Sequence, residues 1–175
     1  MMDNQRSLAR LPAADEMFYS SDLERALLLD FFMLFSRFEC ALKRARYVRS
    51  IDNRSSAGAD WDEFAEVASA AWNKGPGPTL LATTTLCSNP PSRQIVTSDK
   101  TITWKVVPPV KPSDLHAVLA TVRRVRNNLF HGGKYGSGPV KDPARDRSLV
   151  DAALCVLKEC VSLSSAVEKQ FPDDY

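Results

Sequence analysis

The sequence predicts an all-α fold, a helical bundle of four to five helices with a small β-hairpin insert. Apolar residues recur at three- and four-residue spacing in three long segments, whereas the only period-two pattern is short and lies between two proline pairs. The 175 residues, 44% of them hydrophobic and 25% charged, fit one globular domain. We expect an N-terminal arm over 1–20, one helical domain over 21–170 with its insert at about 88–109, and a C-terminal tail over 171–175.

The first long helix is expected to begin near Ser21, because Ser21-x-x-Glu24 is a capping box. Apolar residues then keep one face buried for about 25 residues. This predicted face consists of Leu23, Leu27, Phe31, Leu34, Phe38, Leu42 and Ala45. The first half of the segment is apolar nearly all round. It is therefore expected to be covered on more than one side, either at the centre of the bundle or at a subunit interface.

Shorter elements are expected in the middle of the chain. Residues 51–60 form a turn-rich loop, and a short helix follows from Asp62 to about Trp72. Another turn or two of helix is expected from Thr79 to Cys87, stopped by Pro90-Pro91.

A β-hairpin is expected next, because 95–97 and 102–106 alternate with a period of two. Its turn is Ser98-Asp99-Lys100, and Pro108-Pro109 closes it. Its small size indicates an ornament on the bundle rather than the core of a sheet.

Two long helices complete the fold. Ser113 is expected to cap the first, which continues to about His131 and ends at a left-handed cap on Gly132-Gly133. After a loop over 134–144, the last helix is expected to run from Arg145 to about Lys169.

Composition excludes several kinds of site. A net charge of +2 means that any affinity for nucleic acid must come from a local patch. The four cysteines contain no C-x-x-C pair and the chain has two histidines, which argues against a zinc site, so we expect no metal and no cofactor. Apolar, reduced cysteines indicate a cytoplasmic protein. The most hydrophobic stretch, 26–38, is too short to span a bilayer, so no membrane partner is expected.

Arg126 has an unusual predicted position. An apolar stripe runs along its helix, and Arg126 lies inside the stripe, about 40° from Val122 by the helical repeat. A guanidinium there must pack its stem on apolar surface and find acceptors or an anion for its head. The ordinary partner would be a carboxylate such as Glu39 or Asp151, and the functional one a phosphate.

Asn127 and His131 are neighbours on an adjoining face of the same helix, four residues apart. His131 is expected at the helix C-terminus, where the dipole favours the imidazolium. Nearby basic residues, including Arg123, Arg124 and Lys134, suit a phosphate.

Two interpretations of this segment stay open. His131 is an ordinary residue of a helix cap, or it is the acid–base group of a metal-free RNA-cleaving site. In the second case Arg126 binds the scissile phosphate and Asn127 orients the histidine or the substrate. Because one histidine supplies only one such group, this interpretation calls for two copies meeting across a dimer axis.

The segment Arg126-Asn127-Asn128-Leu129-Phe130-His131 is similar to the R-x4-6-H motif of HEPN domains (higher eukaryotes and prokaryotes nucleotide-binding). The similarity includes the polar residue that commonly follows the arginine. Glu39-x3-Lys43-Arg44 in the first helix resembles the E-x3-K-R element of some HEPN branches. The resemblance spans about Asp22 to Ala166.

The resemblance implies a helical homodimer whose two motifs face one cleft, and a metal-independent endoribonuclease that leaves a 2′,3′-cyclic phosphate. It implies an RNA substrate, an antitoxin protein as a candidate partner, and a role in toxin–antitoxin or phage defence. The implied residues are catalytic Arg126, Asn127 and His131, supporting Glu39 and Lys43, and RNA-binding Arg123 and Lys134.

Blander alternatives accompany these roles. Glu39 and Lys43 also have the spacing of an i,i+4 ion pair, which would contribute only ~0.3–0.5 kcal/mol. Arg123 and Lys134 could equally be charged side chains exposed to solvent. Some family members keep the dimer without cutting RNA, so a non-catalytic module for RNA or nucleotide binding or for assembly is the alternative function.

Overall fold

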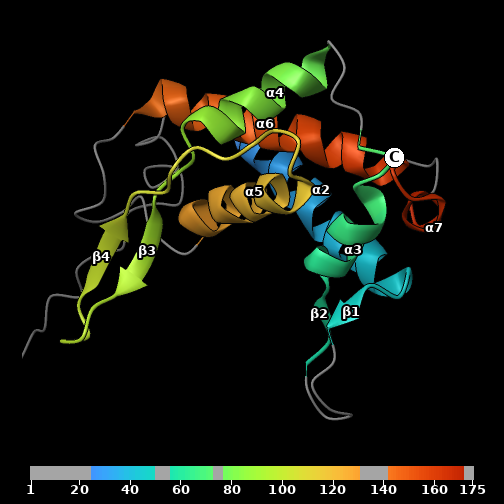
Figure 1. Cartoon of the computed structure of the whole chain (residues 1–175), viewed down its shortest axis with the longest axis horizontal. Helices are drawn as coiled ribbons and strands as arrows, with labels where there is room; N and C mark the ends of the chain where they lie inside the picture. Colours follow the sequence, from blue (N-terminus) through green and yellow to red (C-terminus); the bar gives the residue numbers. More distant parts are fainter. Residues whose placement is uncertain (1–24, 50–55, 73–76, 131–141, 172–175) are drawn as a thin grey trace, which may run out of the picture.

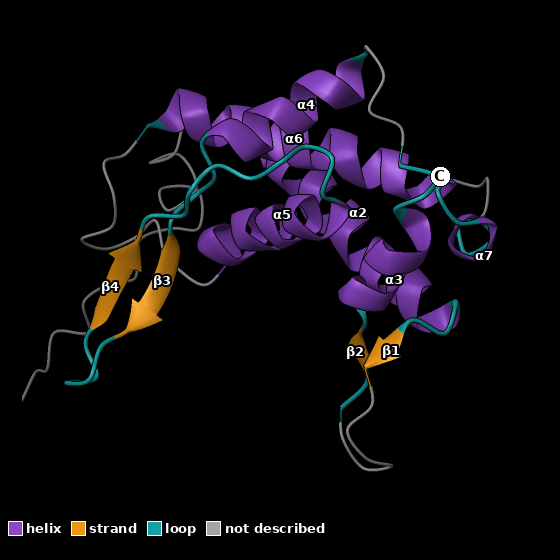
Figure 2. Ribbon diagram, in the orientation of Figure 1, coloured by secondary structure: helices purple, strands orange, loops and turns teal. Residues whose placement is uncertain are grey.

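The computed structural model describes residues 25–49, 56–72, 77–130 and 142–171. Within these residues the molecule is mainly helical, with two short antiparallel strand pairs beside the helices (Figure 1, Figure 2). The predicted mainly α fold with a hairpin is thus confirmed. The helices are α2 (Arg25–Arg44), α3 (Trp61–Ala68), α4 (Pro78–Ser88), α5 (Leu115–Phe130), α6 (Pro143–Ser162) and α7 (Ser165–Glu168). The strands are β1 (Val48–Arg49), β2 (Gly58–Ala59), β3 (Arg93–Val96) and β4 (Ile102–Lys105).

One hydrophobic core lies between the helices. α6 packs against both α2 and α4, and α5 packs against α3 and α4. Burying each large apolar side chain stabilises the fold by roughly 1.5–3 kcal/mol. The largest fully buried side chains come from five helices and include Phe31, Phe38, Leu42, Phe64, Leu86, Leu119 and Leu157.

α2 buries one face and leaves other apolar side chains exposed. Phe31, Phe38 and Leu42 are buried as predicted, while Phe35 is buried in place of Leu34, which is only half-buried. Within the described part of the chain, α2 is therefore not enclosed at the centre of the bundle. Its exposed apolar side chains, with their exposed fractions, are Leu29 (58%), Phe32 (45%) and Met33 (49%).

Several predicted boundaries lie outside the described residues, namely the arm over 1–20, the capping box at Ser21 and the Gly132-Gly133 cap. Phe171, which was placed in the tail, packs against the core, with the guanidinium carbon of Arg37 5.0 Å from its ring centre. No helix among the described residues is both long and apolar enough to cross a membrane.

α3 begins one residue before the predicted start and ends a turn early, at Ala68. Asp60 caps it, because its Oδ1 accepts hydrogen bonds from the backbone N–H groups of Asp62 and Glu63 at 3.1 and 3.0 Å. The predicted loop before it contains β2, which pairs with β1. Each of these strands is two residues long, too short to show the alternation on which a strand prediction depends.

α4 occurs where a short helix was predicted, and the hairpin β3–β4 follows it. β3 begins at Arg93, earlier than expected, since the pairing Arg93↔Lys105 extends the ladder beyond the apolar pattern. The hairpin stands at one side of the helices (Figure 1).

Asp114, not Ser113, caps α5, because its Oδ1 accepts from the Ala117 N–H at 3.0 Å and its backbone oxygen accepts from Val118. α5 is described as far as Phe130.

The last predicted helix is divided in two, so the described residues hold six helices rather than four to five. α6 begins before Arg145, because Asp142 accepts from the Arg145 N–H at 3.0 Å and Pro143 suits the first helical position. It ends at Ser162, and Ser164 has an extended backbone. The chain turns there, and α7 buries Val167 completely.

Candidate functional site

Arg126 lies near the C-terminal end of α5, on the side that contacts α2. Its guanidinium carbon is 5.3 Å from the centre of the Phe35 ring, a distance typical of a cation–π contact. Its Nη1 donates a hydrogen bond to Oδ1 of Asn127 at 3.1 Å. Asp151, one of the two carboxylates considered as its partner, lies 3.8 Å from Nε of Arg147. Arg126 is half-buried, with an aromatic face and an amide against its charged head.

Glu39, the other carboxylate, is bonded to α3. Its Oε1 accepts a hydrogen bond from Nε1 of Trp61 at 3.2 Å. No ion pair between Glu39 and Lys43 occurs among the described residues, and Lys43 is exposed. The i,i+4 ion pair is therefore not formed, and within the described ranges Lys43 takes no part in the ring contacts of Arg123 and Arg126 or in the hydrogen bond of Asn127. Glu39 instead connects α2 to the start of α3.

Trp61 is the residue around which several candidates gather. Its buried indole lies 5.2 Å from the Phe35 ring, and the Arg123 guanidinium carbon is 5.8 Å from the indole centre. We call Phe35, Trp61, Arg123 and Arg126 the arginine–aromatic cluster. It places two arginines of α5 on two touching aromatic rings, with Glu39 at the edge of the indole. No local sequence pattern connects Trp61 to Arg123 or Arg126, because they lie on helices far apart in the chain.

Asn127 and Asn128 have opposite surroundings although they are adjacent. Asn127 is exposed and receives the Arg126 hydrogen bond. Asn128 is 8% exposed, and its Nδ2 donates to the backbone oxygen of Ser92 at 2.9 Å. The first amide is available to a ligand, whereas the second connects α5 to the residue before β3.

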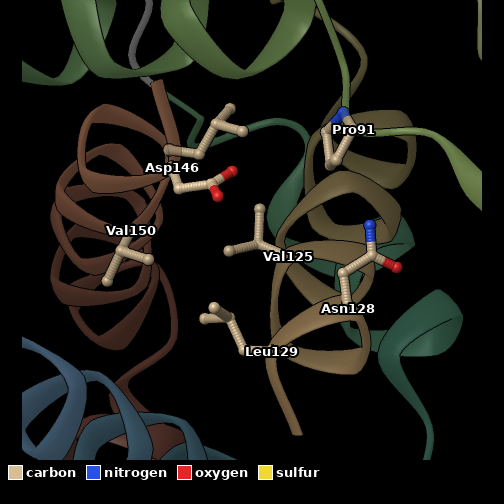
Figure 3. A pocket seen from close by; sticks show the side chains of 7 residues that line it. Pro91, Val125, Asn128, Leu129, Asp146 and Val150 are labelled. Carbon is tan, nitrogen blue, oxygen red and sulfur yellow. The ribbon is translucent and has the colours of Figure 1, made fainter. Parts of the chain in front are cut away.

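The cavity beside Asn128 is too small for a substrate. It lies between α5 and α6, lined partly by Val125, Leu129, Asp146 and Val150 (Figure 3). Its volume of about 10 Å³ is at the lower limit for one water molecule. This side of α5 is therefore packing surface, and a substrate would have to approach another side.

A larger groove lies between β3 and α5. Its volume is about 470 Å³, within the range of ligand-binding pockets. Arg123 and Asn127 are candidate site residues from the sequence, whereas Arg93 is not, because the sequence predicts that the hairpin is peripheral to the bundle. The lining consists of three arginines, three amides and one alanine: Arg93, Gln94, Ala120, Arg123, Arg124, Asn127 and Asn128.

His131 and Lys134 lie outside the described residues. Phe130, which precedes His131, is 43% exposed, and its ring centre is 5.3 Å from that of Phe32 in α2. The other histidine, His116, is at the opposite end of α5, with its Nε2 3.3 Å from Oε2 of Glu66. Ten residues of helix separate His116 from Arg126, about 15 Å along the axis.

All four cysteines are free. Burial, and to a lesser extent the charge of Asp114, raises the pKa of the Cys87 thiol to about 11. Burial, followed by the charge of Glu159, raises the pKa of Cys160 well above its usual range. A reactive cysteine needs a lowered pKa, so these two thiols behave as small apolar core residues.

Among the described residues, no three His, Cys, Asp or Glu side chains come close enough together to hold a metal ion. Comparisons with protein-family models, with curated proteins and with solved structures each found no match to this chain.

Proposed function

We propose that this protein is a dimeric, metal-independent endoribonuclease of the HEPN type that acts in a toxin–antitoxin or phage-defence role. The observation that carries the proposal is the setting of Arg126. Its guanidinium lies over Phe35 and is bonded to Asn127, at the end of a long helix and five residues before His131 in the sequence. A guanidinium held in this position is suited to bind a phosphate. Its charge is already in place, so it needs little reorganisation when negative charge develops in the transition state.

In the proposed reaction the ribose 2′-oxygen attacks the adjacent phosphorus and the bond from phosphorus to the 5′-oxygen breaks. One imidazole takes the 2′-hydroxyl proton and another gives a proton to the departing 5′-oxygen. The products are a 2′,3′-cyclic phosphate and a 5′-hydroxyl. Arg126 binds the non-bridging phosphate oxygens, and Asn127, whose Oδ1 accepts from Arg126, directs its amide N–H groups toward the histidine or substrate.

Two copies are needed to supply two imidazoles, because His116 is about 15 Å from Arg126 along α5. The exposed apolar surface formed by Leu29, Phe32, Met33 and Phe130, which we call the α2 surface, supports such a dimer. It continues into a groove of about 330 Å³ that Arg25 and Leu28 also line. A two-fold axis there would bring the C-terminal ends of both α5 helices together.

The direct test is cleavage of total RNA by the purified protein in excess EDTA. Wild type should cleave, and His131→Ala and Arg126→Ala should lose at least about a hundredfold in rate, the scale of one acid–base or charge-stabilising group. His116→Ala is the matched control, since it removes the other histidine and should cleave like wild type. Equal, negligible cleavage by wild type and His131→Ala would refute the enzymatic proposal.

The second candidate function is a non-catalytic HEPN dimer that binds RNA or a nucleotide or serves in assembly. It is favoured by the contact between Arg126 and Phe35, because a packed guanidinium also stabilises the fold. Under this alternative Arg126→Ala lowers the unfolding temperature and His131→Ala changes no cellular phenotype. Under the enzymatic proposal, expression of wild type arrests growth, His131→Ala does not, and a cognate antitoxin relieves the arrest.

A further inference from the structure

The groove between β3 and α5 has the chemistry of an anion site. Arg93 approaches it from the hairpin, and Arg123 and Arg124 approach it from the helix. None of the described residues that line it is acidic, and its only apolar side chain is that of Ala120. Three positive charges and their amide neighbours thus line one groove, and its lining within the described residues contains no carboxylate.

Arg124 has a buried polar atom in the wall of this groove. Its Nη1 is buried and makes no hydrogen bond within the described part of the chain. Burial lowers the pKa of Arg124, and the nearby charge of Arg93 lowers it further. Both effects disfavour the charged guanidinium. An anion placed between the two arginines would offset both effects, because its negative charge favours the charged guanidinium and screens the repulsion between Arg93 and Arg124.

The fold keeps these two arginines together. Asn128 lies one turn after Arg124 on α5. Its Nδ2 donates a hydrogen bond to the backbone oxygen of Ser92, the residue before Arg93. On the other side of the hairpin root, Nη2 of Arg145 donates to the backbone oxygen of Asn89 at 2.9 Å. The start of β3 is therefore attached to both α5 and α6. Hydrogen bonds to two helices thus support the juxtaposition of Arg93 and Arg124.

The groove is continuous with the candidate site. Asn127 lines it and also accepts the hydrogen bond of Arg126. A chain lying along the groove would thus reach Arg126 at its end. The volume of about 470 Å³ suits one or two nucleotides of a single strand rather than a duplex. An acidic peptide fits less well, since peptide recognition usually needs a pocket for an apolar anchor.

We propose that this groove binds the phosphodiester backbone of single-stranded RNA, with one phosphate held between Arg93 and Arg124 and the next nucleotide directed along Asn127 toward Arg126. The inference rests on the proposed function, because it names the path by which the RNA substrate reaches that site. Guanidinium groups bind phosphate oxygens in two-pronged fashion, and the amide side chains of Gln94 and Asn127 supply further donors. The hairpin is then part of the substrate-binding surface.

The test is binding of a fluorescein-labelled 12-nucleotide oligouridylate, measured by anisotropy between 50 and 200 mM KCl. Full-length His131→Ala is the parent, so that the RNA stays intact. Adding Arg93→Gln or Arg124→Gln should weaken binding about tenfold, and each lost phosphate contact should reduce the slope of log K against log salt by about 0.7. Lys158→Gln is the control, because Lys158 is exposed on α6, does not line the groove and carries the same charge.

Arg93 is exposed, so Arg93→Gln keeps the test valid if Arg124→Gln fails to fold. If the folded Arg93→Gln and Arg124→Gln variants bind the RNA as tightly as the Lys158→Gln control, the inference would be overturned. Competition by polyglutamate as effective as that by unlabelled RNA would also overturn it, in favour of an acidic protein partner. If both arginine variants bind RNA more weakly but the wild type cleaves no RNA, the proposed reaction would be refuted and the proposed RNA-binding groove would be supported. Normal cleavage and normal RNA binding by both variants would refute RNA binding in the groove without affecting the proposed reaction.

Discussion

The adjacent residues Asn127 and Asn128 should have opposite mutational effects, because one faces the groove and the other holds the hairpin. Asn128→Ala removes the bond from Nδ2 to the Ser92 oxygen at a position that is 8% exposed. The loss of a buried hydrogen bond with one partner left behind costs about 1–3 kcal/mol. A chain of this size loses about 2–4 °C of unfolding temperature per kcal/mol, so a decrease of about 2–12 °C is expected.

Asn127→Ala should leave the unfolding temperature nearly unchanged, because Asn127 is exposed and such substitutions stay within about 0.5 kcal/mol. It should instead lower RNA cleavage, since the amide beside Arg126 is lost. Asn128→Asp separates hydrogen bonding from packing. It keeps the shape but turns an acceptor toward the Ser92 oxygen, and it should destabilise at least as much as Asn128→Ala.

The measurements are thermal and urea unfolding, both followed by circular dichroism, and cleavage of a defined RNA by the same protein samples. Urea midpoints convert to free energy through a slope common to all variants, provided that the slope does not change. Equal destabilisation by Asn127→Ala and Asn128→Ala would refute the division of labour between the two amides. Full stability of Asn128→Asp would refute the attachment of the hairpin through Ser92.

Three further predictions concern the surface, the core and pH. Phe32→Glu on the α2 surface should convert a dimer to a monomer in light scattering, whereas Leu81→Glu, at a 71% exposed position on α4, should not. Val167→Ala should lower the unfolding free energy by about 2 kcal/mol in urea, because α7 buries Val167 completely. The raised pKa of Cys87 means that the folded state retains a proton that the unfolded state loses, so stability should fall between pH 9 and about 11. Cys87→Ala should show a smaller alkaline decrease than wild type; an identical decrease would contradict the prediction.

Most helices were predictable because a helix depends on contacts between residues three or four apart, which a sequence displays directly. The buried faces of α5 and α6 follow from such spacing, with Leu119 and Val156 as examples. The errors occur where a local preference competes with packing. Residues 145–169 are amphipathic throughout, yet the serines around Leu163 allow a turn, and the chain uses it to bring Val167 into the core.

Some features of the candidate site could likewise be predicted from the sequence, and others could not. The unusual position of Arg126 and its neighbour Asn127 could be inferred from helical geometry, because both belong to one helix. The other features join elements far apart in the chain. Trp61 meets Glu39 from twenty-two positions away and Arg123 from another helix. No periodic pattern in the sequence indicates contacts of this kind.

The sequence by itself determined the helical class, the location of the long helices and the place of Arg126 and Asn127 on α5. Each of these depends on the local helical repeat. Only the tertiary structure decided that Arg126 rests on Phe35, that Trp61 bonds to Glu39, and that Arg93 and Arg124 share one groove. These pairings depend on how the hairpin and helices pack against one another, since side chains remote in sequence become neighbours only when a common core holds their backbones together.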